Sequence, residues 1–167
     1  MPLGRPTLSR RAAMLVAVLL ATGCASGDRQ VETTTMTNPI DFQTLERPSS
    51  PNTFLVAPTD LLGNTTADAP APQFAQSPEA VFATLLTVIK SERAFSEIAT
   101  DDAERAVRFV ATVPVFGFKD DVDAVVIPIE SGSTIAVYSR SRVGYSDLGV
   151  NKKRTEKLLA ALDKALR

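Results

Sequence analysis

The stretch DVDAVVIPIESGSTIAVYSRSRV, residues 121–143, predicts the fold more directly than any other part of the chain. Two runs rich in β-branched residues, 121–129 and 133–143, flank the dipeptide Ser131-Gly132. A small residue followed by glycine between two such runs is typical of a tight two-residue turn. The stretch therefore predicts an antiparallel β-hairpin.

This turn also predicts which residues of the two strands face each other. If Ser131 and Gly132 form the turn, Asp123 lies directly opposite Arg140 and Asp121 opposite Arg142, with Val125 opposite Tyr138 on the same face. Opposed side chains of opposite charge stabilise a strand pair by roughly 0.2–1 kcal/mol. We therefore expect two acids and two arginines to form a charged cluster at the open end of the hairpin.

The flanking sequence predicts two helices and three further strands. Ser77 is a good N-cap before Pro78, and apolar residues then recur at helical spacing up to about residue 92. A second helix is expected from Ser146 or Asp147 to about Leu166, with shorter strands over 53–57, 96–100 and 105–113. We expect an α+β fold: a single domain with an antiparallel sheet of about four to five strands and two main helices packed on one face.

The charged cluster has three possible roles. It extends from Lys119 and Asp120 before the hairpin to Asp147, Asn151 and Arg154 after it. The first role is a structural ion-pair network that fixes the hairpin register and caps the second helix. The second is a ligand-binding site in which guanidinium groups bind a carboxylate or phosphate. The candidate ligand-binding residues are Arg140, Arg142, Arg154, Lys119, Asp121, Asp123, Asp147 and Asn151. The third is a catalytic turn, with Asp120 or Asp121 as general base and Lys119 as electrostatic stabiliser.

Composition argues against several classes of function. The chain has no histidine and one cysteine, which removes the commonest metal ligand and the usual base of a serine or cysteine nucleophile. We therefore predict no metal site, no cofactor and no catalytic residue. Without residues 1–23, which hold three arginines and no acid, the chain has 15 basic and 19 acidic side chains, and this formal charge of −4 argues against binding of nucleic acid.

The N-terminus has the pattern of a bacterial lipoprotein signal peptide. Three arginines precede an uncharged apolar run, residues 12–21, and small residues lead to Cys24. We predict a signal peptide over residues 1–23, lipidation of Cys24, a flexible tether over 24–47 and a domain over 48–167. No aspartate follows the cysteine, which favours a cell-envelope location on the outer membrane, facing the periplasm.

A basic run begins the second helix. Lys152, Lys153 and Arg154 are followed by Lys157. Such a run is most often a solvated helix face, and a contact with anionic lipid headgroups is the alternative.

Three blocks of the sequence together resemble a known family. They are Pro48 to Asn52, Gly117 to Asp123 and Ser139 to Asn151, joined by Arg154. Over residues 48–166 the chain resembles the bacterial and plastid domain of unknown function 1499. The resemblance implies an envelope-associated or organellar α+β domain with no agreed reaction. The family usually has cysteine where this chain has Thr53.

Three hypotheses for the function follow from these observations. The leading one is a non-catalytic binding module in a membrane-anchored envelope lipoprotein, whose partner is an envelope protein or a small anionic ligand. The first alternative is a histidine-free periplasmic enzyme that uses the turn Lys119-Asp120-Asp121 with Arg140 and Arg142. The second is a structural component of an envelope complex.

Overall fold

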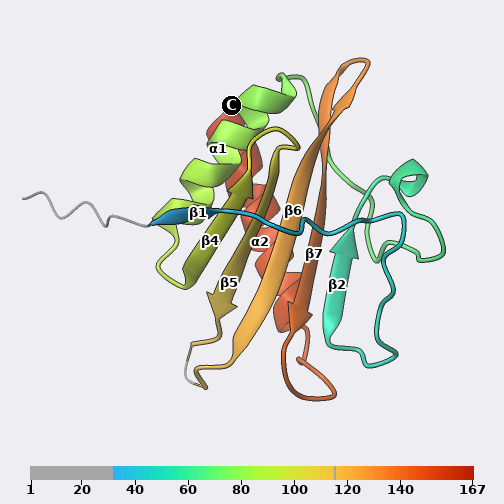
Figure 1. Cartoon of the computed structure of the whole chain (residues 1–167), viewed down its shortest axis with the longest axis vertical. Helices are drawn as coiled ribbons and strands as arrows, with labels where there is room; N and C mark the ends of the chain where they lie inside the picture. Colours follow the sequence, from blue (N-terminus) through green and yellow to red (C-terminus); the bar gives the residue numbers. More distant parts are fainter. Residues whose placement is uncertain (1–31, 115) are drawn as a thin grey trace, which may run out of the picture.

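A seven-stranded mixed sheet carries two helices on one face in the computed structural model, which describes residues 32–114 and 116–167 (Figure 1). The predicted signal peptide and Cys24 lie outside the described residues. In chain order the elements are β1 (Thr33–Thr35), β2 (Thr53–Val56), the 3-10 helix η1 (Thr59–Leu61), β3 (Gln73–Phe74), α1 (Pro78–Ser91), β4 (Phe95–Asp101), β5 (Ala106–Thr112), β6 (Lys119–Ile129), β7 (Gly132–Ser141) and α2 (Val150–Leu166).

The sheet is larger than the sequence predicted, and it is not purely antiparallel. Its order is β1-β4-β5-β6-β7-β2, with β3 also paired to β7. β1 runs parallel to β4, whereas the other pairings are antiparallel. The two additional strands, β1 and β3, are three and two residues long. Segments this short have no detectable hydrophobic period, which is why the predicted sheet of four to five antiparallel strands was too small.

A side chain accepts hydrogen bonds from backbone amides at the start of each of the two α-helices. The Ser77 hydroxyl accepts a hydrogen bond from the Ala80 amide, and Pro78 opens α1, so this N-terminus agrees with the prediction. α2 starts later than predicted, at Val150, because Gly149 has φ +80° and breaks the helix before it. The Asp147 carboxylate still caps this helix, since it accepts from the amides of Gly149 and Asn151.

Alternation along the central strands places two apolar clusters on opposite faces of the sheet. On the helix-covered face, Val122, Ala124 and Val126 of β6 belong to the main core with the buried faces of α1 and α2. On the other face, Val125 and Ile127 pack against a smaller cluster. Neighbouring residues of one strand therefore meet different surroundings.

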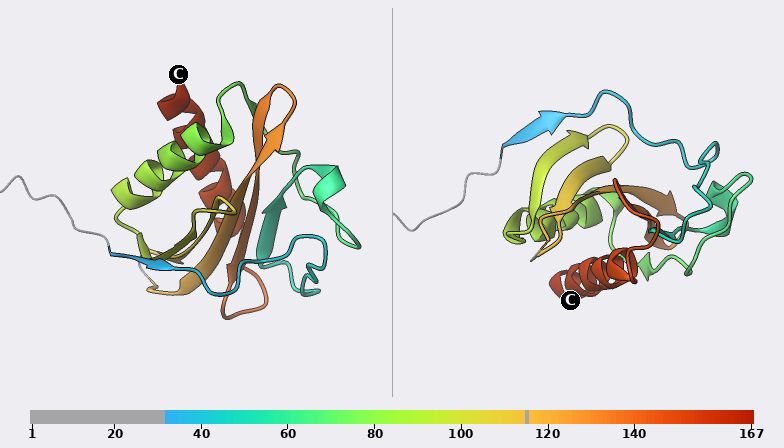
Figure 2. Two further views of the ribbon diagram at one scale, coloured as in Figure 1. Left: turned by 45° about the horizontal axis from the view of Figure 1, so that its top comes forward. Right: turned by 90° about the horizontal axis from the view of Figure 1, so that it is seen from below.

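The second face is crossed by residues 36–47, part of the segment that we predicted to be a flexible tether (Figure 2). Phe42 is buried there and packs in one cluster with Leu55, Ala136 and Tyr138. Arg47 fixes the end of the segment, since it donates to Thr53 and forms an ion pair with Asp68 at 2.7 Å. From Thr33 onward the chain thus contributes to the folded domain.

The hairpin turn is one residue earlier than predicted. Ile129 pairs with Gly132, so Glu130 and Ser131 form the turn and Asp121 lies opposite Arg140. The predicted register was therefore wrong by two residues. A shift of two keeps every side chain on its predicted face, because side chains alternate with a period of two.

Candidate functional site

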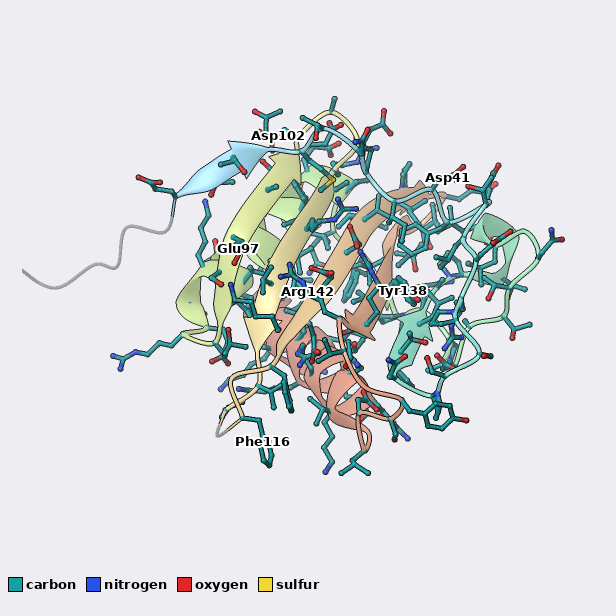
Figure 3. All side chains as sticks on the ribbon, turned by 60° about the horizontal axis from the view of Figure 1, so that its bottom comes forward. Asp41, Glu97, Asp102, Phe116, Tyr138 and Arg142 are labelled. Carbon is teal, nitrogen blue, oxygen red and sulfur yellow. The ribbon has the colours of Figure 1, made fainter. Side chains whose placement is uncertain are left out.

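The charged residues at the open end of the hairpin divide between the two faces of the sheet. Asp120 points toward the helices, whereas Asp121 and Asp123 point to the face that residues 36–47 cross. Figure 3 shows this second face, with Glu97, Arg142 and Tyr138 spread across it. We call the charged part of it the open face: Glu97, Arg108, Lys119, Asp121, Asp123, Tyr138, Arg140 and Arg142. The single cluster predicted from the sequence is therefore two clusters.

On the helix side, a buried ion pair joins the sheet to α2. Arg154 forms an ion pair with Asp120, and both side chains are at most 9% exposed. The same guanidinium donates to Ser139 Oγ at 3.0 Å and to Asn151 Oδ1 at 2.6 Å. Because the charge is matched one to one and closed off from solvent, this cluster is a structural joint.

Asn151 extends this joint to the N-terminal part of the domain. Its side-chain amide donates to the backbone carbonyl of Asn52 at 2.9 Å and to Ser141 Oγ at 3.0 Å. Asn52 in turn donates to the carbonyl of Gly144 at 2.7 Å. One buried amide thus connects β2, β7 and α2, as satisfied polar networks in a core do.

On the open face, one buried carboxylate lies between two arginines. Asp123 accepts from Arg108 Nε at 2.7 Å and from Arg140 at 2.6 Å, one bond to each oxygen. The Asp123 side chain is 2% exposed, whereas those of Arg108 and Arg140 are 33% and 28% exposed. Two cations share one anion, so this triad has a surplus positive charge that solvent can reach.

Two further ion pairs continue the open face toward its end. Arg142 donates to Asp121 at 2.7 Å, and this hydrogen bond raises the pKa of Arg142. Lys119 donates to Glu97 at 2.6 Å, which lowers the pKa of that carboxyl. Arg142 also lies 4.0 Å from Glu97, so two cations and two acids are joined here and their charges balance. The surplus charge therefore belongs to the triad around Asp123.

Tyr138 lies beside this triad. The guanidinium carbon of Arg140 is 5.3 Å from the centre of its ring, within the range of a cation–π contact. Burial raises the pKa of the Tyr138 hydroxyl, so the group stays neutral at physiological pH. The Tyr138 ring thus contacts the Arg140 guanidinium and also packs in the apolar cluster that contains Phe42.

A cavity of about 580 Å³ lies between residues 36–43 and the sheet, and Asp123 is part of its lining. Most of the other lining side chains are apolar, among them Ile40, Phe42, Val125 and Ile127. Its charged lining residues are Asp41, Glu104, Arg105 and Asp123, whereas Arg108 and Arg140 do not line it. A mainly apolar cavity with a few polar groups is the usual form of a small-molecule site.

The structure thus brings together five of the eight predicted ligand-binding residues. Lys119, Asp121, Asp123, Arg140 and Arg142 share the open face. Arg154 and Asn151 lie on the helix side, and Asp147 caps α2. Sequence reasoning missed Arg108. The signal available was a lone arginine in the apolar run AVRFVAT, residues 106–112.

The turn Lys119-Asp120-Asp121, on which the enzyme hypothesis depends, does not bring its three side chains together. Lys119 pairs with Glu97 and Asp121 with Arg142 on the open face, whereas Asp120 is bound to Arg154 on the helix side. None of the three lines the cavity beside Asp123.

The described part of the chain contains neither a cluster of metal ligands nor a helix that could span a membrane. Within residues 32–114 and 116–167, no group of acidic, histidine or cysteine side chains is arranged to hold a metal ion. Neither helix among these residues has both the length and the apolar character needed to cross a bilayer.

Comparisons with known proteins find one family. A family model described as Protein of unknown function (DUF1499) matches residues 33–162. A comparison with curated proteins finds no match. Among solved structures, the crystal structure of protein CV1439 from Chromobacterium violaceum matches at 12% identity and a TM-score of 0.31. The match covers 70% of this chain and 95% of that one, and at this score it carries no conclusion.

Proposed function

This chain belongs to the family described as Protein of unknown function (DUF1499), and on that premise we propose that it is a non-catalytic binding module for a small anionic ligand. The proposed site is the triad of Arg108, Asp123 and Arg140 on the open face. The observation that carries the proposal is the single buried carboxylate shared by two partly exposed guanidiniums.

The charge balance of the triad favours an anion. A carboxylate or phosphate group beside Arg108 and Arg140 would neutralise the surplus cation, and guanidinium groups bind both anions with two parallel hydrogen bonds. Asp123 and the ring of Tyr138 hold the two arginines in place before any ligand arrives. Such preorganisation lowers the ordering cost of binding.

The neighbouring cavity suggests the rest of the ligand. Asp123, the central residue of the triad, is part of its lining, and most of the other lining side chains are apolar. A ligand with an anionic head and a short apolar body would place the head at the triad and the body in the cavity. We therefore propose a small anionic amphiphile, such as a medium-chain carboxylate.

Substitution of Arg108 tests this site. Arg108→Gln leaves Arg140 and Asp123 as a balanced ion pair, so the fold should survive while the surplus charge is lost. With decanoate as the probe in isothermal titration calorimetry, we expect saturable binding to the parent protein and at least ten-fold weaker binding to the variant, since charge-assisted hydrogen bonds contribute about 1.5–3 kcal/mol.

Arg167→Gln is the matched control. Arg167 is an exposed arginine paired with one aspartate, Asp163, and it lies at the far end of α2. This variant should bind decanoate as the parent does. Equal affinities of the parent and Arg108→Gln, or no binding by the parent, would overturn the proposed site.

We further propose that the module acts in the bacterial envelope, anchored by a lipid on Cys24 and facing the periplasm from the outer membrane. The support is the signal-like N-terminus: arginines, a short apolar run and small residues before the only cysteine. Mass spectrometry of the mature N-terminus tests this location. We expect an acylated cysteine as the first residue, and an uncleaved, unmodified chain would contradict the proposal.

A further inference from the structure

Large apolar side chains are exposed at one end of the sheet. Leu148 is 89% exposed, Tyr145 75% and Phe116 72%. Phe118 and Val143 are also more than half exposed. We call these five residues the apolar tips. In Figure 3, Phe116 extends from the body of the domain at this end.

The apolar tips come from two connections that lie side by side. Phe116 and Phe118 precede β6, and Val143, Tyr145 and Leu148 follow β7. Asp120 at the start of β6 pairs with Ser141 at the end of β7, so both connections leave the same end of the sheet (Figure 1). The rings of Phe116 and Phe118 stack with centres 5.9 Å apart. The tips of both connections therefore lie at the same end of the sheet.

The backbone holds Leu148 outward at a cost. Its φ is +52°, a left-handed conformation that leucine rarely adopts. The Ser146 hydroxyl accepts a hydrogen bond from the Leu148 amide, which stabilises this turn. A fixed, strained turn that presents a leucine to water is unfavourable for the isolated domain, and contact with an apolar phase would offset it.

Basic side chains lie next to the apolar tips. Lys152 and Lys153 are exposed in the first turn of α2, which begins two residues after Leu148. Lys152 has only a long contact, 3.9 Å, with Glu156, and Lys153 has no acidic partner among the described residues. Aromatic and leucine side chains beside lysines are the composition that binds the interface of an anionic bilayer.

A second cavity lies near the two connections, although none of the five apolar tips is part of its lining. It has a volume of about 350 Å³, and its lining includes Phe95 and Leu158, Pro114 of the first connection, and Val150, which directly follows the second. Lys153 also lines it. Apolar space beside a cation suits an amphiphile better than it suits a flat protein surface.

We propose that the apolar tips dock onto an anionic lipid surface, with Lys152 and Lys153 against the headgroups. This inference goes beyond the proposed ligand site, because it concerns other residues at another place in the fold. In the docked state the side chains of Phe116, Tyr145 and Leu148 lie among the lipids, and the hairpin turn at Glu130 and Ser131 points away from them.

The absence of tryptophan from the chain allows a position-specific test. Single reporters are introduced in the intact protein as Leu148→Trp and Phe116→Trp, with Ser131→Trp at the opposite end of the sheet as control. Each protein is added to vesicles of phosphatidylglycerol and phosphatidylcholine, some containing brominated lipid. Because the reporters sense depth at their own positions, a lipid on Cys24 would not produce the signal.

We expect blue-shifted emission and quenching by brominated lipid at positions 148 and 116, and neither at 131. Equal quenching at all three positions, or none at 148 and 116, would overturn the proposal. Equal docking on vesicles of phosphatidylcholine alone would also overturn it. Protection of position 148 by a co-purified protein, without quenching by lipid, would show that the tips bind a protein instead.

Two lysines of the same helix give a matched pair for the charge. Lys153→Gln, measured with the Leu148→Trp reporter, should shift the docking equilibrium about five-fold toward the undocked state. Lys164→Gln, at the distal end of α2, should leave it unchanged. Equal effects of the two substitutions would contradict the proposed orientation.

Discussion

The aspartate–arginine clusters on the two faces of the sheet differ in their exposure to solvent and in their charge balance. On the helix side, Asp120 and Arg154 are matched one to one, hidden from water and bound to a buried asparagine. On the open face, Asp123 is equally buried, but its two arginines reach solvent and exceed it in charge. In the first arrangement all charge is neutralised within the protein, whereas in the second one positive charge has no counter-ion and could bind an anion.

This difference shows that neighbours in sequence need not share a role. Asp120 and Asp121 are adjacent, yet the alternation of β6 sends one to a structural joint and the other to a solvent-accessible face. The residues of a charged motif on a strand should therefore first be separated into those on each face of the sheet, and a function assigned only afterwards.

The largest expected effect comes from breaking the helix-side joint. Arg154→Gln leaves the Asp120 carboxylate buried without its partner, and loss of one member of a buried pair costs about 3–5 kcal/mol. Arg142→Gln, which breaks the exposed pair with Asp121, should cost less than about 1 kcal/mol. Urea denaturation of both variants measures the difference, and similar losses would show that the two faces do not differ as described.

We expect Asp123→Asn to lower the stability of the fold and to raise the affinity for decanoate. Removal of the carboxylate leaves two arginines unpaired, so we expect a loss of about 2 kcal/mol in unfolding free energy. The same change increases the positive charge at the proposed site, and the asparagine oxygen can still accept a hydrogen bond from one arginine and hold it in place. Decanoate should therefore bind more tightly than to the parent. Calorimetry measures the affinity. Weaker binding by a folded Asp123→Asn protein would contradict the charge argument.

The smallest effect is expected at the pair formed by Lys157 and Glu92 between the helices. The hydrogen bond from Lys157 lowers the pKa of Glu92. A lowered folded-state pKa stabilises the protein above the usual glutamate value, and this contribution is lost as the pH falls through the folded-state pKa. Because Lys157 is largely exposed and Glu92 is partly exposed, Glu92→Gln should cost less than about 1 kcal/mol near neutral pH.

Urea unfolding at two pH values checks this sign. The difference between the parent and Glu92→Gln should be largest near neutral pH and disappear in acid, where Glu92 is protonated. A difference that grows in acid would mean that Lys157 does not stabilise the charged carboxyl.

The hairpin shows how far the sequence could predict the site. The partnerships of Arg140 with Asp123 and of Arg142 with Asp121 are confirmed, although the register was wrong by two residues. Long arginine side chains reach diagonal partners, so the ion pairs tolerate that error. The error in register arose because we assigned Gly132 to the turn. A Cβ at this position would come within 2.1 Å of the Phe74 carbonyl oxygen, so glycine is needed here for the close approach of β3 and not for the turn.

Features that depend on distant contacts could not be predicted from local patterns. β1 is three exposed threonines, and its strand conformation comes from pairing with β4, more than sixty residues away. Arg108 has no charged neighbour in its own strand, and its partner becomes visible only when β5 and β6 are aligned. The α+β class and the capped start of α1 were local properties, and these predictions are confirmed.

The pairing of β1 with β4 limits how far the domain could travel if Cys24 carries a lipid. Nine residue steps separate Cys24 from Thr33, and a fully extended chain of that length reaches about 30 Å. A free segment up to residue 47 would have reached roughly 80 Å. With the shorter connection, the folded domain would stay within about 30 Å of the membrane surface, which is close to the thickness of one bilayer. It would then meet ligands mainly in the layer next to the membrane.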